Sequence, residues 1–289
     1  SLFKKIKKYF TNIFNEISEK ENVIDNKIYP KIVILSNINR DKKQYSVYKD
    51  FYYGSLAKFF KNDFLFVYRN YLPNRSNLLL EKFDNKKKIL ILNKKSNLLN
   101  EIRIILKSLY IFILCKKLYF QTKNSFKRKF LKEGSKYKTV ASCIANLRLV
   151  YQIERVLKKT NPSIFIYTFE GHAWEKALCS HIKKKFPKIK IYGYQFSTIF
   201  KNHNIFDFYK NKDHIPHIIL TKGKINYNKL INSPLKNFAD IEIIGFNNRK
   251  IPFHKKYKFE KNVCLIAPEL MRMEISMMFN FSKKISLEN

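Results

Sequence analysis

The chain has 289 residues, of which 45% are hydrophobic and 16% aromatic. This length and composition exclude an intrinsically disordered protein and predict one large or two medium domains with a sizeable core. Lys and Arg outnumber Asp and Glu by 58 to 22, a formal net charge of +36, and such a basic surface attracts anionic membranes, nucleic acid or acidic sugars.

The first segment, SLFKKIKKYFTNIF, is basic, and its apolar residues recur at helical spacing. It has no long apolar stretch and no small-residue cleavage site, so it is not expected to be a secretory signal. A basic amphipathic helix at residues 1–18 suits an anionic membrane surface, and packing on the protein's own core is the equal alternative. The most apolar helical stretch, residues 104–115, is too short to span a bilayer and contains Lys107.

Short apolar runs alternate with longer stretches of helical periodicity along the chain. Several runs are apolar at consecutive positions, as expected for strands with both faces covered. This alternation predicts an α/β fold, a Rossmann-like and largely parallel sheet with helices on both faces. The strands are expected at residues 31–36, 64–68, 87–93, 163–170, 188–195, 217–220, 241–246 and 263–269. The helices are expected at about 54–61, 97–120, 139–159, 172–186, 225–231 and 269–280.

The composition changes near residue 247, which suggests a domain boundary. Residues 1–246 are predicted to form a Rossmann-like domain, and the polar, basic and weakly periodic segment 247–262 is predicted to be a linker. A fresh strand and helix begin in VCLIAPELMRMEISMMF, so residues 263–289 are interpreted as the start of a second, truncated domain. Packing of this last unit on the first domain is the alternative.

The segment TFEGHAWE places a carboxylate, Glu170, at the end of a predicted buried strand. Gly171 permits a tight turn there, and His172 lies near the start of the next helix. A buried carboxylate is costly unless it is paired or used, and ligands of parallel α/β sheets bind at the carboxyl ends of strands. Glu170 is therefore a candidate catalytic group, with a structural carboxylate that caps the helix as the equal alternative. Glu175 falls in the first helical turn, where its charge suits the dipole, and Trp174 is interpreted as a core residue.

Two other strand ends carry polar side chains. In GYQFSTIF, Gln195 and Ser197 can hydrogen-bond a sugar hydroxyl or a phosphate, or else cap the following turn. In IIGFNNR, Asn247 and Arg249 are candidates to line an interdomain cleft, and a plain surface turn is the favoured alternative.

Several common sites lack their signatures. The chain has no GxxxxGK[ST], GxGxxG, HExxH or GxSxG motif, which argues against a P-loop ATPase, a dinucleotide enzyme, a zincin and a serine hydrolase. The HxxH formed by His214 and His217 lacks a clear third ligand, so no metal site is predicted. The 4 cysteines form no CxxC pair, which fits a reducing compartment.

At YTFEGHAWEKAL, KIKIYGYQFS and IIGFNNRK followed by VCLIAPE, the chain resembles bacterial surface-carbohydrate glycosyltransferases of GT-B architecture. These enzymes assemble lipopolysaccharide, O-antigen or capsule, and the resemblance covers roughly residues 160–280. It implies two Rossmann-like domains face to face, with the acceptor mainly on the first and the nucleotide-sugar mainly on the second. Residues 1–246 would then be the acceptor-side domain. CMP-activated acidic sugars rank beside UDP- and GDP-sugars as donors.

The resemblance also implies roles for the candidate residues. Glu170 would act as base or nucleophile, and His172 is the second choice for the base. The substrate-binding residues would be Gly171, Gln195, Ser197, Asn247 and Arg249. No cofactor is expected beyond the nucleotide-sugar cosubstrate. The protein would be cytoplasmic and peripheral to the inner membrane, where an anionic leaflet holds glycan or lipid-linked acceptors.

A non-enzymatic, basic nucleic-acid-binding α/β protein is the alternative function. Lys is dispersed along the chain and the aromatic residues fall largely inside predicted strands and helices, so nucleic acid is not the expected partner. A third possibility is a scaffold that keeps the fold without activity.

Overall fold

The computed structural model describes residues 29–38, 50–54, 56, 63–70, 89–92, 98–200, 204–245 and 272–288. The chain divides into two compact units, Ser1–Asn248 and Arg249–Asn289. The described part of the second unit is a single helix, α8 (Arg272–Glu288), where a helix was predicted at 269–280. The predicted linker at 247–262 and the predicted strand at 263–269 lie outside the described residues.

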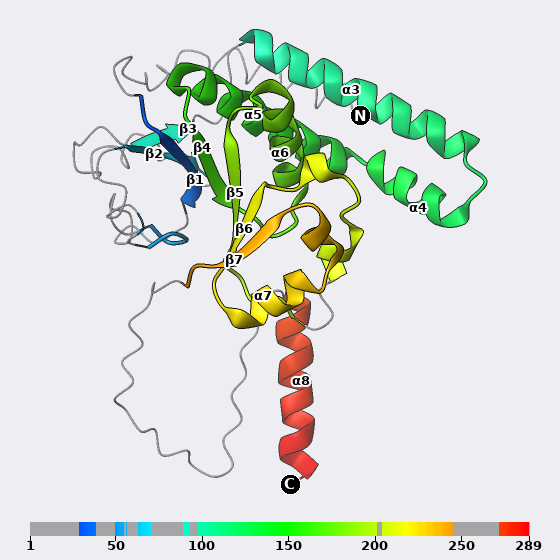
Figure 1. Ribbon diagram of the computed structural model, residues 1–289. Coiled ribbons are helices and arrows are strands. Elements are labelled where there is room, and N and C mark those ends of the chain that lie inside the picture. Colours follow the sequence, from blue (N-terminus) through cyan, green and yellow to red (C-terminus); the bar gives the residue numbers. More distant parts are fainter. Residues whose placement is uncertain are drawn as a thin grey trace, which may run out of the picture. The chain divides into compact units, whose positions relative to one another are not determined.

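A seven-stranded parallel sheet lies at the centre of the first unit (Figure 1). Its strand order is β3-β2-β1-β4-β5-β6-β7, and every neighbouring pair runs parallel. The chain therefore leaves β1 toward β2 on one side and later places β4 on the other side of β1. The topological switch point, where doubly wound sheets bind ligands, lies between β1 and β4. The strands are β1 (Ile32–Ile38), β2 (Phe64–Asn70), β3 (Ile89–Leu92), β4 (Ile164–Thr168), β5 (Lys190–Gln195), β6 (Ile218–Thr221) and β7 (Asp240–Ile243).

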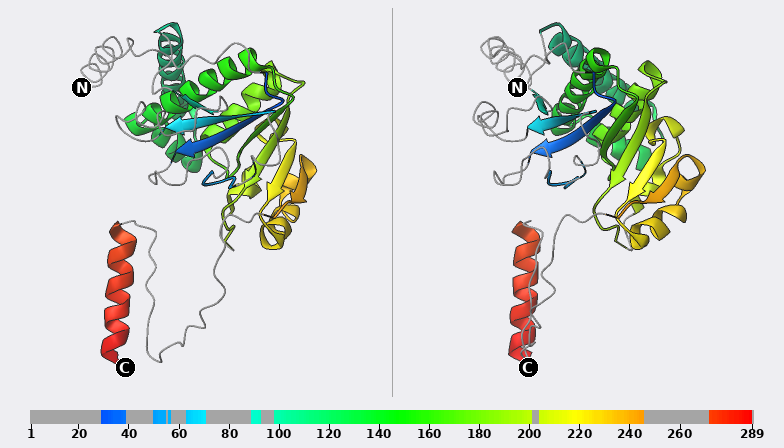
Figure 2. Two further views of the ribbon diagram at one scale, coloured as in Figure 1. Left: turned by 90° about the vertical axis from the view of Figure 1, so that its left-hand side faces the viewer. Right: turned by 60° about the vertical axis from the view of Figure 1, so that its left-hand side comes forward.

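Side chains of each strand alternate between two cores, because successive residues point to opposite faces of a sheet. Val33 and Leu35 belong to the core that also contains residues of α5 (Tyr137–Thr160) and α6 (Ala173–Lys185). Ile34 and Ile38 belong to the opposite core, which the segment 50–54 and Leu56 help to close. Figures 1 and 2 show α5 and α6 together over one face of the sheet. The predicted α/β class, a parallel sheet flanked by helices, is confirmed.

Three helices connect β3 to β4 across this face. The helix α3 (Leu98–Gln121) packs on α5, and α4 (Ser125–Gly134) packs on α3. A buried ion pair joins α3 to α5. Arg148 Nε lies 2.6 Å from Glu101 Oε1, and Arg148 Nη2 lies 2.8 Å from Glu101 Oε2. Another helix, α7 (Lys224–Ile231), connects β6 to β7. Among the described residues, no helix is sufficiently long and apolar to span a membrane.

Most predicted elements within the described residues agree with the structure, with differences at their ends. The most consequential difference is at β4, which ends at Thr168, so Glu170 lies in the turn beyond the strand. The helix α4 was not predicted, because its sequence SFKRKFLKEG has few apolar positions. Asn124 nonetheless caps it, since its side chain accepts a hydrogen bond from the Lys127 N–H. The predicted helix at 54–61 lies largely outside the described residues.

Candidate functional site

The turn between β4 and α6 lies beyond the carboxyl end of β4, beside the β1/β4 switch point. Gly171 in this turn has φ 90°, a conformation that side chains rarely adopt. A Cβ atom at this position would come within 2.8 Å of Ile205 Cδ1. The predicted role of Gly171 as a turn residue therefore has two physical reasons, its backbone conformation and the close packing of Ile205.

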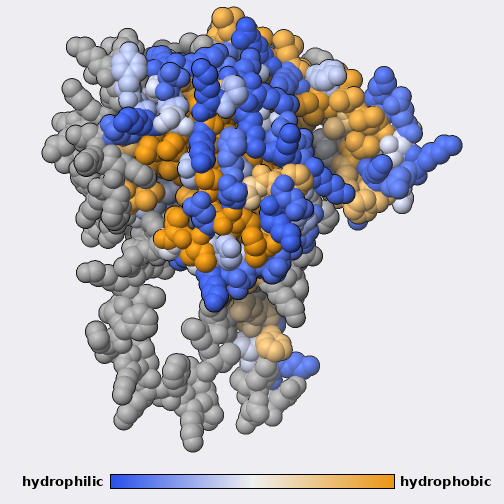
Figure 3. Space-filling view, viewed as in Figure 1, coloured by the Kyte–Doolittle hydropathy of each residue, from blue (hydrophilic) through white to orange (hydrophobic). Residues whose placement is uncertain are grey.

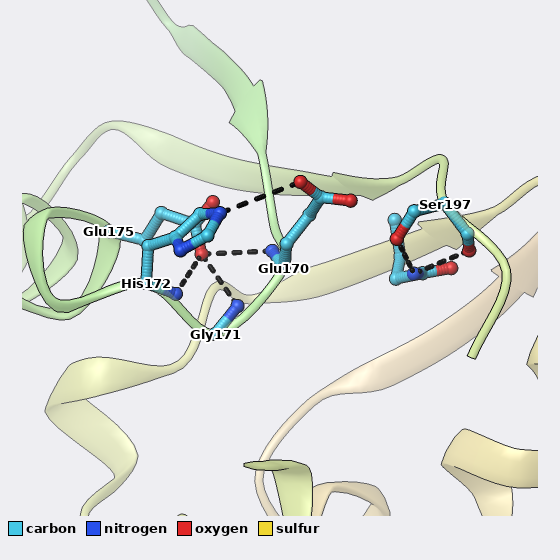
Figure 4. A network of polar contacts seen from close by, with 6 residues as sticks. Glu170, Gly171, His172, Glu175 and Ser197 are labelled. Carbon is cyan, nitrogen blue, oxygen red and sulfur yellow. Dashed lines mark hydrogen bonds and ion pairs between the residues drawn. The ribbon is translucent and has the colours of Figure 1, made fainter. Parts of the chain in front are cut away.

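A buried carboxylate fills the inside of this turn, and it belongs to Glu175. Its Oε2 accepts hydrogen bonds from the backbone N–H groups of Glu170 at 2.9 Å, Gly171 at 2.7 Å and His172 at 2.9 Å (Figure 4). Burial raises the pKa of Glu175 to about 7, although these N–H groups favour the charged form. The other oxygen, Oε1, accepts no hydrogen bond from any described residue. Because Glu175 already occupies three N–H groups, these groups are not open to a substrate phosphate.

Glu170 and His172 form a pair on the accessible side of the same turn. His172 Nε2 lies 3.6 Å from Glu170 Oε2, and the two side chains are 56% and 20% exposed, respectively (Figure 4). The neighbouring Glu170 carboxylate raises the pKa of His172, and partial burial opposes this effect. Glu170 is thus only partly buried, and the fully buried carboxylate of this turn is that of its neighbour Glu175.

An arginine that sequence analysis missed lies near this pair. Arg69 belongs to β2, and its guanidinium carbon lies 5.6 Å from the centre of the Trp174 ring. Its positive charge lowers the pKa of His172, because it repels the protonated imidazole. Trp174 itself is buried in the core, as predicted. The only sequence signal for Arg69 was a charged residue near the end of the apolar run FLFVYRN.

Gln195 and Ser197 belong to a hydrogen-bond network at the end of β5. Gln195 is buried, and its Nε2 donates to Ser197 O at 2.8 Å and to Ser197 Oγ at 3.2 Å. The Asn226 side chain of α7 donates to Gln195 Oε1 and to Ser197 O, and it accepts from the Ile199 N–H at 3.2 Å. Both ends of the Gln195 amide are thus engaged within the fold, which matches the turn-capping alternative. Ser197 is only partly buried, and Figure 4 shows it beyond the end of the strand next to β4.

A second buried carboxylate fixes the segment that follows β1. Asp50 Oδ2 accepts from Ser36 Oγ at 2.9 Å, and its Oδ1 accepts from the N–H groups of Tyr52 and Tyr53. The Tyr53 hydroxyl donates to Leu35 O at 3.1 Å. Burial raises the pKa of Asp50. These bonds hold the segment 50–54 against the carboxyl half of β1.

The other residues singled out from the sequence are either not described or engaged elsewhere. Asn247 and Arg249 lie outside the described residues. His217 Nδ1 accepts a hydrogen bond from the Ile191 N–H at 2.9 Å. This ring therefore binds the backbone where β5 and β6 begin, at the end of the strands opposite to the site. Across the described ranges, no group of three or more His, Cys, Asp or Glu residues is placed to hold a metal ion.

Comparisons of the chain with protein-family models, with curated proteins and with solved structures find no match. Any functional conclusion therefore depends on the site and on the surface of the protein itself.

Proposed function

We propose that the protein is a nucleotide-sugar-dependent glycosyltransferase in which Glu170 and His172 act on the acceptor. One observation carries this proposal, the position of an accessible carboxylate–imidazole pair just beyond the carboxyl end of β4. In a doubly wound sheet, ligands bind at this edge beside the switch point. Glycosyl transfer requires a group of this kind to remove a proton from the acceptor hydroxyl.

The transfer step assigns a role to each member of the pair. Glu170 takes the proton of the acceptor hydroxyl as the acceptor oxygen bonds to the anomeric carbon of the donor sugar. The bond between that carbon and the phosphate oxygen breaks, and its electron pair leaves with the nucleotide. His172 lies beside the carboxylate and is the second candidate for the base. Direct attack by Glu170 on the anomeric carbon is the variant for a retaining reaction.

The departing phosphate carries negative charge that a nearby cation can stabilise. Among the described residues, Arg69 is the one we assign to this role. Helix N-termini often bind phosphate, but the N–H groups of the β4–α6 turn already donate to Glu175. Arg69 brings a guanidinium to the same edge of the sheet, beside His172 and Trp174. The donor class would be CMP-linked acidic sugars or UDP- or GDP-sugars, and the acceptor a surface glycan or a lipid-linked sugar at the cytoplasmic side of the inner membrane.

Thermal unfolding in the presence of CMP-, UDP- and GDP-sugars tests donor binding. We expect one nucleotide class to raise the Tm of the wild type by several degrees at saturating concentration, since a ligand at 100 times its Kd stabilises by about 2.7 kcal/mol. Arg69→Gln should reduce this shift, and Glu170→Gln should retain it because Glu170 acts on the acceptor. The matched control is Glu133→Gln, which changes an exposed carboxylate of α4. Absence of a shift with all three classes would contradict donor binding.

A further inference from the structure

The helices α3 and α4 expose an apolar surface that the sheet does not cover. On α3, the residues Leu99, Ile102, Leu106, Tyr110 and Ile113 follow one another at spacings of three and four, so they lie on one side of the helix. Leu106 is 61% exposed and Tyr110 is 65% exposed. In the first half of α3 the opposite side is buried, at Glu101, Ile104, Ile105 and Ser108, and the Glu101–Arg148 ion pair anchors this half in the fold.

The short helix α4 adds two aromatic rings. Phe126 and Phe130 are 68% and 64% exposed, and their ring centres lie 4.8 Å apart. On the side toward α3, Arg128 lies over the ring of Tyr119 at 4.9 Å, which holds the two helices together. We use the name hairpin surface for these two exposed apolar faces, which are Leu99, Ile102, Leu106, Tyr110 and Ile113 of α3 and Phe126 and Phe130 of α4.

The helices that carry the hairpin surface are rich in basic residues. Residues 98–134 contain nine Lys or Arg residues and two Glu residues. Both glutamates are already paired, Glu101 with Arg148 and Glu133 with Lys136. Figure 3 shows hydrophobic and hydrophilic side chains side by side over the region of α3 and α4. The two helices therefore combine exposed apolar side chains with an excess of basic residues.

We propose that the hairpin surface docks the protein on an anionic phospholipid membrane. Transfer of Leu, Ile and Phe side chains from water to the boundary between head groups and acyl chains lowers the free energy of the system. Long basic side chains can reach the anionic head groups beside them. Nucleic acid would pair with the lysines but would leave the aliphatic residues in water, because these residues offer no flat face for base stacking. A second copy of the chain would bring two positive surfaces together, which costs free energy.

Co-sedimentation with vesicles of phosphatidylcholine, with and without phosphatidylglycerol, tests this proposal on the full chain. We expect binding that requires phosphatidylglycerol and weakens with salt. Leu106→Ser with Ile113→Ser, and separately Phe126→Ser with Phe130→Ser, should each weaken it by about tenfold or more. Lys127→Gln with Lys129→Gln should weaken it roughly tenfold.

Two control variants separate this surface from general effects. Ile225→Ser changes an equally exposed aliphatic residue of α7, and Lys184→Gln with Lys185→Gln changes exposed lysines at the end of α6. Both controls should bind vesicles like the wild type. Because the altered hairpin residues are exposed, far-UV circular dichroism should show an intact fold in every variant.

Either of two results would overturn the proposal. In the first, the hairpin variants bind as tightly as the wild type, or the controls weaken binding equally. In the second, the wild type does not bind vesicles and instead binds an unrelated RNA through Lys127 and Lys129. The inference does not depend on sugar transfer, because the assay contains no sugar donor, so its failure and the failure of the proposed reaction can be distinguished.

Discussion

Glu175 lies at the centre of the site and has no contact with solvent. A carboxylate in this position loses its hydration, and three backbone N–H groups compensate for only part of that loss. Burial consequently raises the pKa of Glu175 to about 7. Its charge also acts on His172, whose pKa it raises. The protonation of one buried residue is thereby linked to the turn that holds the Glu170–His172 pair.

The substitution Glu175→Gln tests this description of the turn. Gln keeps an oxygen for the three backbone hydrogen bonds and removes the charge. The pKa of Glu175 is about 7 in the folded protein against an ordinary value of 4.5, so its protonation stabilises the wild type at low pH. This contribution is lost as the pH rises through about 7, and it corresponds to about 3 kcal/mol. We expect the variant to gain stability relative to the wild type between about pH 5 and about pH 8, as measured by urea unfolding at each pH.

The control for this experiment is Glu133→Gln, because Glu133 is exposed and lies on α4. This control removes one carboxylate from the surface and leaves the β4–α6 turn unchanged. A difference between Glu175→Gln and the wild type that does not change with pH would show that the Glu175 carboxylate does not titrate in this range.

At the residue scale, the sequence singled out the turn between β4 and α6 as a candidate site but did not predict the arrangement within it. Glu170, Gly171 and His172 could be singled out because a carboxylate and a glycine follow a buried strand. Which glutamate turns inward depends on the strand ending at Thr168, and the sequence does not fix that end. Arg69 could not be assigned to the site, because its approach to Trp174 joins residues far apart in the chain.

At the scale of elements, most of the strands could be predicted because each is a short apolar run between polar turns. The strand order was harder to predict, since it depends on how the chain returns from β3 at the sheet edge to β4 beside β1. That return uses α3, α4 and α5, and α4 shows almost no apolar periodicity. The position of the switch point, and hence of the site, follows from this return.

The Glu101–Arg148 ion pair is expected to hold this return path together. Arg148→Met would leave the buried Glu101 carboxylate without its main cation, at a cost of about 3–5 kcal/mol in the free energy of unfolding. The double variant Glu101→Leu with Arg148→Met should recover a large part of that loss. Lys158→Met is the matched control, since it breaks an ion pair with Glu154 in which the lysine is exposed, and it should cost less than about 1 kcal/mol. Urea unfolding measures all three. Equal costs for Arg148→Met and Lys158→Met would contradict a structural role for the buried pair.

At the scale of the whole molecule, part of the formal charge of +36 is concentrated in the helices α3 and α4. The helices α3 and α4 carry both the apolar hairpin surface and an excess of basic residues, whereas the edge of the sheet combines Glu170 and Glu175 with Arg69 and His172. The proposed division is that one surface holds the protein at an anionic membrane and the other acts on a sugar acceptor. Whether residues 1–18 add to membrane binding stays a prediction, because they lie outside the described residues.

The proposed role of Glu170 is that of the base in glycosyl transfer at the edge of the sheet. The direct measurement is the incorporation of labelled sugar from CMP-, UDP- and GDP-sugars into membranes of the source organism, with wild type, Glu170→Gln and Glu133→Gln compared at equal concentration. We predict incorporation from one donor class, a rate for Glu170→Gln that is lower by about 10²- to 10⁴-fold, and an unchanged rate for Glu133→Gln. No incorporation from any donor class, or a Glu170→Gln variant as fast as the wild type, would contradict this role.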